Sequence, residues 1–449
     1  MEQLSSYPKK GARHFERKPY GRTIAYSLAM PVSEQVENPA FRGRAIDISD
    51  AGLGIETDYP LAPGHVLWVI GGINRSGVVR WCREWNGNYR AGIELSLEAQ
   101  PAPNKAAIGT AAYVGEEPVR YHELLARATE RFTGELKALE KRCSDPSENP
   151  EKLLRATEKA MDGVLAACAD FEQDVKDKKI IRSARVSFHE KTNPVLSRSF
   201  CINRVRTWPQ GSQGDYKTLE YVYKNTPLSE GLGYYLDLYL LNSTLAHAVR
   251  NRIKRLEEML GEEIGKRKQP SVLNIGCGSC RELMGIAPEI MDSEAKIICV
   301  DMDNDALAFA QDRLSYAGII SQVELRRYNA LRMFDAETNM AEFGNQDIIY
   351  SVGLFDYLPT DFLVKLLPAL YRLLNPGGKL IAAFKDAARY RSQDYHWIAD
   401  WDGFLQRKGE DFRAILSAAG IPHEAISETR EESGAIVFYV AIRQDKSHE

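Results

Sequence analysis

The stretch from Val272 to Glu282, VLNIGCGSCRE, combines residue types that can bind a nucleotide. Its apolar residues lead into a turn with Gly276 and Gly278, which let the backbone turn sharply and approach a ligand closely. The dinucleotide fingerprint G-x-G-x-x-G is not met, because Arg281 stands at its last position. A lone Gly-x-Gly is more often a simple tight turn, so this loop gains meaning only from residues elsewhere in the chain.

Polar residues flank the apolar runs that follow. Asp301 ends the run KIICV, and a carboxylate there can accept two hydrogen bonds from a ribose diol. Asn329 and Ala330 follow the next run and suit an adenine edge. Asp347 opens the run IIYSVGLFDYL, whose far end would face the reacting group. Ligands of open parallel sheets bind beyond the carboxyl ends of the strands, so these residues together predict one ligand site.

The elements that must position these residues alternate in type from about Pro270. Strand-like runs such as SVLNIGCG, AKIICVDMD and GGKLIAAF are separated by helix-like segments. This alternation predicts a Rossmann-like α/β fold, with a parallel sheet covered by helices on both faces.

The four pieces in this order, followed by LLNPGG, resemble the class I S-adenosylmethionine-dependent methyltransferases over roughly Pro270 to Arg443. The resemblance implies a methyltransferase that uses S-adenosylmethionine. It implies cofactor binding at Asn274, Gly276, Cys277, Gly278, Asp301, Asp303, Asn329 and Ala330.

A narrower resemblance is to bacterial 3-hydroxypalmitic acid methyl ester biosynthesis proteins. It rests on WPQGSQGDYKTLEYVYKN (Trp208 to Asn225), AVRNR, NIGCGSCRE, GLFDYL and YHWIADW. An arginine that usually precedes Gly-Asp-Tyr is missing here, where Gln210, Gly211 and Ser212 stand. The resemblance implies a fatty-acid or other small-molecule carboxylate as the methyl acceptor.

Methyl transfer from a sulfonium is an in-line displacement, in which positioning supplies much of the acceleration. A carboxylate acceptor is already ionised, whereas a hydroxyl or amine acceptor would need a general base. Asp356 and Tyr357, after the fourth strand-like run, are candidate catalytic residues. His396 is a third candidate that could orient or deprotonate an acceptor, with a polar surface loop as the alternative.

Four residues are predicted to contact the substrate. Tyr395 and Trp397 lie beyond the strand LIAAF, where the fold places the acceptor mouth. Asp215 and Tyr216 follow a glycine-rich turn and could form part of a lid, although Asp215 could equally cap a helix.

The pair Cys277 and Cys280 has the Cys-x-x-Cys spacing of metal and redox sites. No second Cys-x-x-Cys or His-x-x-x-His is present, and the surrounding motifs are not thioredoxin-like. We therefore expect no metal, and small loop residues at both positions.

The N-terminal region has a different pattern, with short strand-like runs between about Thr23 and Leu97 that predict a small antiparallel barrel or sandwich. Asp47, Ser49 and Gly52 form a D-x-S-x-x-G motif, which follows RHFERKPYGR. Together these resemble the PilZ domain, a small barrel that binds cyclic di-GMP. Asp47 and Ser49 would bind a guanine edge.

Arginines before the barrel would clamp the phosphates of this ligand and stack on guanine. The family pattern R-x-x-x-R gives Lys18 and Arg22 in the usual register, or Arg13 and Arg17 five residues earlier. Both registers stay open, as does a PilZ domain that has lost ligand binding.

Two amphipathic segments parted by CSDPSENP predict a helical hairpin or linker over residues 116–180, which could also form a homodimer interface. The predicted organisation is multidomain, with a PilZ-like barrel at 1–105, this hairpin, and a methyltransferase domain with a helical lid at 181–449.

Composition bounds the partners. The polar N-terminus, the lack of a long apolar run and the seven scattered cysteines predict a cytoplasmic protein without a transmembrane segment or disulfide framework. A formal net charge of −4 and the absence of a base-methylase tetrad argue against nucleic acid.

The sequence thus predicts a cyclic di-GMP-responsive methyltransferase acting on a small molecule. The alternative is a cyclic di-GMP-binding adaptor whose methyltransferase fold is idle or senses cofactor.

Overall fold

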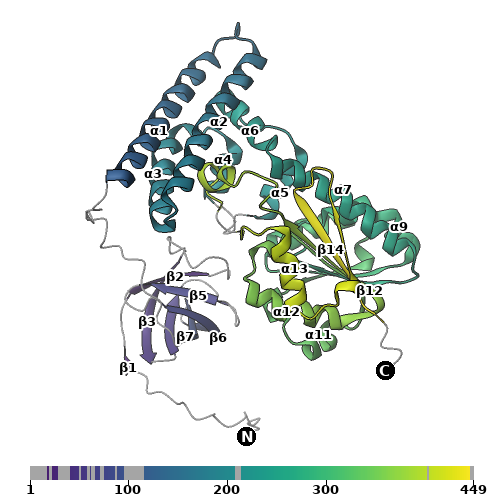
Figure 1. Cartoon of the computed structure of the whole chain (residues 1–449). Helices are drawn as coiled ribbons and strands as arrows, with labels where there is room; N and C mark the ends of the chain where they lie inside the picture. The colour runs from purple at the N-terminus through teal and green to yellow at the C-terminus, as the bar shows by residue number, and fades with distance from the viewer. Residues whose placement is uncertain are drawn as a thin grey trace. The chain divides into compact units, whose positions relative to one another are not determined.

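In the computed structural model the chain divides into two compact units, Met1–Ala111 and Ala112–Glu449 (Figure 1). The structure describes residues 18–19, 23–28, 41–49, 52–57, 61, 66–70, 75–85, 88–95, 116–207, 214–401 and 404–444. The sequence predicts a separate helical segment at 116–180, whereas these helices belong to the same unit as the C-terminal sheet.

The N-terminal unit is built from antiparallel strands. They are β1 (Lys18–Pro19), β2 (Thr23–Leu28), β3 (Phe41–Ser49), β4 (Gly52–Thr57), β5 (Val66–Ile70), β6 (Arg75–Trp85) and β7 (Asn88–Leu95). Their order is β1-β3-β2-β5-β6-β7-β4, and β3 also pairs with β4, so the order returns on itself. Alternate residues of β7, namely Ala91, Ile93 and Leu95, are buried in its core, as the two-residue period of a strand requires.

The C-terminal unit begins with helices. They are α1 (Glu116–Arg142), α2 (Pro150–Val175), α3 (Lys178–Leu196), α4 (Phe200–Thr207), α5 (Tyr216–Lys224), α6 (Leu232–Leu241) and α7 (Thr244–Gly265). The α2 helix starts where the Asn149 side chain accepts hydrogen bonds from two backbone N–H groups and Pro150 fixes the first turn. Helices α1, α2, α3 and α6 share one apolar core, which we call the bundle (Figure 1).

A mixed sheet follows, in the order β10-β9-β8-β11-β12-β14-β13. Its strands are β8 (Ser271–Ile275), β9 (Lys296–Asp301), β10 (Val323–Arg327), β11 (Gln346–Val352), β12 (Leu374–Lys385), β13 (Ile426–Arg430) and β14 (Ile436–Ile442). The first five are parallel, as predicted, whereas β14 is antiparallel to both β12 and β13. The strand order reverses beside β8, which is where open α/β sheets bind ligands.

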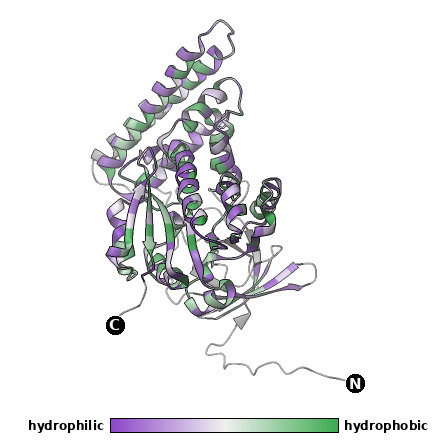
Figure 2. Cartoon of the chain, turned by 90° about the vertical axis from the view of Figure 1, so that its right-hand side faces the viewer, coloured by the Kyte–Doolittle hydropathy of each residue, from purple (hydrophilic) through white to green (hydrophobic). Residues whose placement is uncertain are grey.

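Helices cover both faces of this sheet. Besides α7, they are α8 (Arg281–Gly285), α9 (Ala287–Ser293), α10 (Asn304–Tyr316), α11 (Ala336–Phe343), α12 (Thr360–Leu373) and α13 (Gly409–Ala418). Successive residues of β11 point to opposite cores: Ile348 and Tyr350 pack with α7 to α10, and Ile349 packs with α11 to α13. The strands are accordingly mostly hydrophobic along their length, while the helices alternate in hydropathy (Figure 2).

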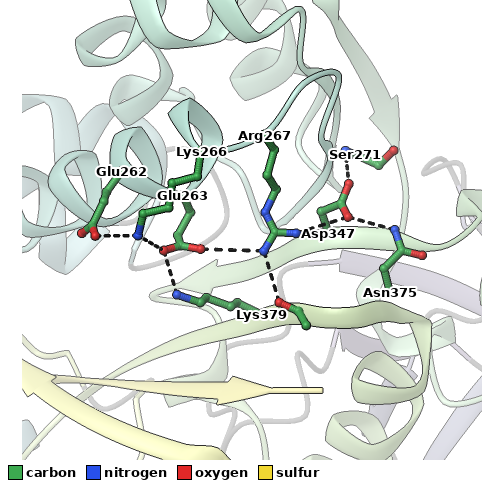
Figure 3. A network of polar contacts seen from close by, with 9 residues as sticks. Glu262, Glu263, Lys266, Arg267, Ser271, Asp347, Asn375 and Lys379 are labelled. Atoms are coloured by element: carbon green, nitrogen blue, oxygen red, sulfur yellow. Dashed lines mark hydrogen bonds and ion pairs between the residues drawn. The ribbon is translucent and has the colours of Figure 1, made fainter. Parts of the chain in front are cut away.

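The amino ends of the strands are tied together by charges. Asp347 at the start of β11 accepts a hydrogen bond of 2.8 Å from the backbone of Ser271 and pairs with Arg267, which also reaches Glu263 (Figure 3). Lys379 of β12 pairs with the same Glu263 at 2.7 Å. The structure therefore places Asp347 at the edge opposite the predicted ligand site.

Candidate functional site

The glycine loop after β8 has the backbone that the sequence predicts. Gly276 and Gly278 have φ values of +69° and +52°, and Cys280, at the third-glycine position, is also left-handed at +48°. A Cβ on Gly276 would lie 3.1 Å from the Cβ of Leu354, so the loop passes directly over the residues that follow β11. Small residues are needed here for close approach.

Asp301 at the end of β9 holds this loop in place. Its two carboxylate oxygens accept backbone hydrogen bonds from Gly278 at 2.8 Å and from Asp303 at 3.0 Å. Burial raises the pKa of Asp301, although these hydrogen bonds oppose the shift. The carboxylate therefore organises the loop.

The other predicted cofactor residues follow along the same edge. Asp303 caps α10 through the backbone of Asp305, and Asn329 accepts a hydrogen bond of 2.9 Å from the backbone of Leu331. Asn329 is half-buried and Ala330 is buried. Both follow β10, which is paired to β9, so they lie on the Asp301 side of the site.

Asn274 of β8 lines the same cavity as the glycine loop. It is buried and donates a hydrogen bond of 2.9 Å to Glu282, which also accepts one of 2.8 Å from Tyr350. Cys277, in contrast, belongs to the loop itself, and its thiol packs with those of Cys280 and Cys299. Asn274 thus orients Glu282 beneath the loop.

Helix α5 closes over the glycine loop from the other side. Tyr216 lines a cavity of about 50 Å³ together with Gly276, Gly278 and Ser279. Glu220 accepts hydrogen bonds from Ser279 at 2.7 Å, Arg313 at 2.7 Å and Arg281 at 2.8 Å. Burial opposes ionisation of Glu220, but the bonds from Arg313 and Ser279 outweigh it and lower its pKa.

Asp215 is the N-cap of α5. Its side chain accepts from the backbone of Lys217 and Thr218 and pairs with Arg204 at 2.5 Å. Its carboxylate is almost fully buried in these contacts, which is the helix-cap role that the sequence left open.

The predicted catalytic pair lies beyond β11. Asp356 is 1% exposed and pairs with Lys385, the last residue of β12, at 2.5 Å. Tyr357 accepts a hydrogen bond of 3.1 Å from the indole of Trp401, and burial raises the pKa of its phenol. A Cβ on Gly214 would lie 2.5 Å from the Tyr357 hydroxyl, so only glycine fits where the chain enters α5.

Aromatic rings gather beside this pair. Phe404 contacts the rings of Tyr357, Trp401 and Tyr395 at centroid distances of 6.3, 6.0 and 5.9 Å. Tyr395 is buried, and its hydroxyl accepts from the backbone of Leu245 at 3.1 Å. These rings form an apolar wall next to the Asp356–Lys385 pair.

His396 and Trp397 are directed into the bundle instead of the wall. The His396 Nδ1 lies 3.0 Å from Arg185 of α3. Trp397 has no exposed surface, packs between Phe171 and Phe188, and donates to Glu172 of α2 at 2.9 Å. Because the Trp397 ring is fully buried in these contacts, it presents no surface that a substrate could contact.

In the N-terminal unit the motif residues lie on adjacent strands. The carboxylate of Asp47 lies against Gly54 of β4: a Cβ added to Gly54 would be 2.7 Å from the Oδ1 of Asp47. The Ser49 hydroxyl donates to the carbonyl of Gly52 at 3.4 Å. The backbone of β1 pairs with β3, with Lys18 opposite Ile48 and Pro19 opposite Asp47. Arg13, Arg17, Arg22 and the side chain of Lys18 lie outside the described residues.

Several residues of this site were not predicted from the sequence. Lys385 and Phe404 come from segments whose sequence gives no sign that they meet Asp356. Glu220 is the one acid in the amphipathic segment Tyr216 to Lys224, and this was the signal that could have pointed to a buried ion pair there.

Comparison with known proteins matches residues 272–378 to the methyltransferase domain family and residues 12–109 to the PilZ domain family. An uncharacterized protein of Haemophilus influenzae is 26% identical over 129 residues, which are 28% of this chain and 47% of that protein. The match therefore spans about half of the relative's length.

Two solved structures give the scale of the structural similarity. A "possible exported protein" of Bordetella parapertussis covers 74% of this chain and 100% of its own, at 15% identity and a TM-score of 0.44. The magnesium protoporphyrin IX methyltransferase of Synechocystis PCC 6803, solved with bound S-adenosylhomocysteine, covers 45% and 86% at 14% identity and a TM-score of 0.34. No helix in the described parts of the chain is long and apolar enough to cross a membrane.

Proposed function

We propose that this chain, an S-adenosylmethionine-dependent methyltransferase with a PilZ domain, methylates a small-molecule carboxylate and that cyclic di-GMP controls its turnover. The enzyme class and the two ligands follow from the matched domains. The acceptor and the control are proposals.

The residues at the sheet edge fit the cofactor. Asp301 offers a carboxylate for the ribose diol, the left-handed glycines let the backbone approach, and Asn329 with Ala330 flanks the adenine side. When bound, the sulfonium supplies an electrophilic methyl group. The chain's own contribution is to align an acceptor with it and to exclude water.

A carboxylate acceptor is supported by the contacts of the three candidate bases, each of which is already engaged. Asp356 is engaged by Lys385, Tyr357 is held as a phenol by its raised pKa, and His396 contacts Arg185 of the bundle. None of the three is placed to accept a proton from an acceptor. A carboxylate needs no such step, and the wall of Tyr357, Trp401 and Phe404 suits an apolar tail.

The messenger would act through the N-terminal unit, where Asp47 and Ser49 are proposed to bind a guanine edge and Arg13, Arg17, Lys18 or Arg22 the phosphates. Contact of α1 and α2 with a second copy, giving a homodimer, belongs to the same proposal.

The test is release of S-adenosylhomocysteine by the full chain with acceptors that differ in one group. We expect turnover with palmitate in the presence of cyclic di-GMP, and none with hexadecanol or hexadecylamine, because these need a base. Asp301→Ala should abolish the release, which controls for contaminating activity. Turnover with the alcohol or amine instead of the acid would contradict the carboxylate assignment.

A further inference from the structure

Arg252 of α7 is a buried cation without a carboxylate partner among the described residues. It is 3% exposed, its Nη2 donates to the Tyr223 hydroxyl at 3.3 Å, and its Nε has no hydrogen-bond partner. Arg407, which is 6% exposed, donates to two backbone carbonyls and to the Thr360 hydroxyl. Arg204 and Arg313, also of low exposure, pair with carboxylates at 2.5 and 2.7 Å. Within the described parts of the chain, Arg252 has neither kind of partner set. An isolated buried charge is strongly unfavourable, so its retention calls for a counter-ion from outside the chain.

The guanidinium lies at the carboxyl edge of the sheet, between the ends of β8 and β11. It lines the same cavity as Tyr216, Gly276 and Gly278. A Cβ on Gly353 would lie 3.1 Å from its Nη1, so the residue after β11 passes directly across it. A ligand held on the glycine loop therefore meets this guanidinium.

A second cation, Lys385, lies near Arg252. It is paired with the carboxylate of Asp356 at 2.5 Å. Burial lowers the pKa of Lys385, Asp356 opposes this shift, and the positive charge of Arg252 adds to it. Asp356 is thus engaged by Lys385, and Glu282, which also lines the cavity, accepts from Asn274 and Tyr350. An anionic ligand would supply the counter-charge that Arg252 lacks.

We propose that Arg252 binds the carboxylate of a ligand in this site, with the planar, two-pronged geometry that guanidinium groups offer to carboxylates. The inference rests on the proposed function and goes beyond it by naming the residue that binds the carboxylate of the ligand. Two ligands can supply the carboxylate: the amino-acid end of S-adenosylmethionine, or the acceptor.

Calorimetric titration of the full chain separates the two sources. The probes are S-adenosylhomocysteine, 5′-methylthioadenosine, which lacks the amino-acid end, and palmitate added to protein saturated with S-adenosylhomocysteine. If the cofactor is the partner, Arg252→Met weakens S-adenosylhomocysteine at least about tenfold and leaves 5′-methylthioadenosine unchanged. If the acceptor is the partner, only palmitate weakens by that factor.

Arg252→Lys should recover part of the affinity, because it keeps the charge and loses the fork. Lys254→Met removes an exposed positive charge from the same helix and should match wild type throughout. The ligand-free Arg252→Met protein should unfold at a temperature equal to or above that of wild type, since it loses an unpaired buried charge.

A structural role would give the reverse pattern. Affinities for S-adenosylhomocysteine and palmitate that stay within about twofold of wild type, or a ligand-free variant that unfolds earlier, overturn the inference. Failure of the wild type to bind S-adenosylhomocysteine at all would instead overturn the proposed function.

Discussion

A buried acid next to the glycine loop, Glu282, makes the stability of the folded chain depend on pH. Its Oε1 accepts hydrogen bonds from both Asn274 and Tyr350. Burial raises the pKa of this carboxyl to about 7 from an ordinary value of 4.5. The folded state therefore holds a proton that the unfolded chain has released between these two pH values, and it loses stability as the pH rises through them.

Glu282→Gln should remove this loss, because an amide oxygen can accept the same two hydrogen bonds without ionising. Relative to wild type, the free energy of unfolding of the variant should rise by on the order of 2–3 kcal/mol between pH 4.5 and pH 8. Chemical denaturation at both pH values measures it, with the exposed Glu289→Gln as the matched control. An equal difference between variant and wild type at both pH values would contradict the prediction.

Residue positions were predictable where the place along a strand decides the geometry. Gly276, Gly278 and Asp301 could be placed because parallel strands bring their carboxyl ends to one edge. Arg252 and Lys385 could not, because a helix residue and the last residue of a distant strand meet only through packing. Asp356 was expected at the site, but its pairing with Lys385 left no trace in the sequence.

At the scale of elements, Glu220 joins α5 to the glycine loop by hydrogen bonds and ion pairs. Glu220 gathers Ser279, Arg281 and Arg313, which belong to the loop, α8 and α10. Because Arg313 also donates to the carbonyl of Ser279 at 3.0 Å, the loop is held on both its side chain and its backbone. Helix α5, which begins at the residues predicted to form a lid, Asp215 and Tyr216, is thus held at Glu220.

Glu220→Gln should loosen this attachment, because it leaves two guanidinium groups without their counter-charge. We expect a loss of about 3 kcal/mol in the free energy of unfolding. Affinity for S-adenosylhomocysteine should fall about tenfold, as measured by calorimetric titration. Glu230→Gln changes an exposed glutamate just beyond the same helix and should behave as wild type in both measurements. Unchanged affinity in Glu220→Gln would show that the loop keeps its shape without α5.

The helical pattern of α1 and α2 was readable from their 3.6-residue period, but their partner was not. The chain returns from the sheet at Asp394–Ile398. The bundle contacts this segment through Glu172 and Arg185, and α4 contacts it through Arg206. Sequence order placed YHWIADW beside the acceptor, since it follows a sheet strand. Tyr395 and Trp401, at the two ends of that stretch, lie there, whereas the residues between them turn into the bundle.

At the scale of the whole molecule, control by the messenger requires that it favour one arrangement of the chain over another. Within the C-terminal unit a physical connection exists from α2 and α3 to Trp397, and from Trp401 to Tyr357. Such a chain of contacts permits coupling and does not by itself establish it.

Cyclic di-GMP should bind the full chain and change the rate of S-adenosylhomocysteine release. Arg17→Ala and Asp47→Ala should each weaken binding at least about tenfold, because each removes a hydrogen-bonding group for a charged or polar part of the ligand. Arg80→Ala, which removes an exposed cation of β6, is the control and should bind as wild type. Turnover that does not vary up to saturating messenger would reject the coupling while leaving both binding sites intact.

The burial of Trp397 between Phe171 and Phe188 also limits how this protein can be rearranged by gene fusion. A sheet domain that begins at Pro270 would expose the indole of Trp397 to solvent. Helices α1 to α3 alone would lose the ring that packs between Phe171 and Phe188 and donates to Glu172. The bundle and the sheet therefore have to be inherited, expressed and transplanted as one module. The described residues of the N-terminal unit form an apolar core of their own, so we would place a recombination point near Ala111, where the chain divides into its two units.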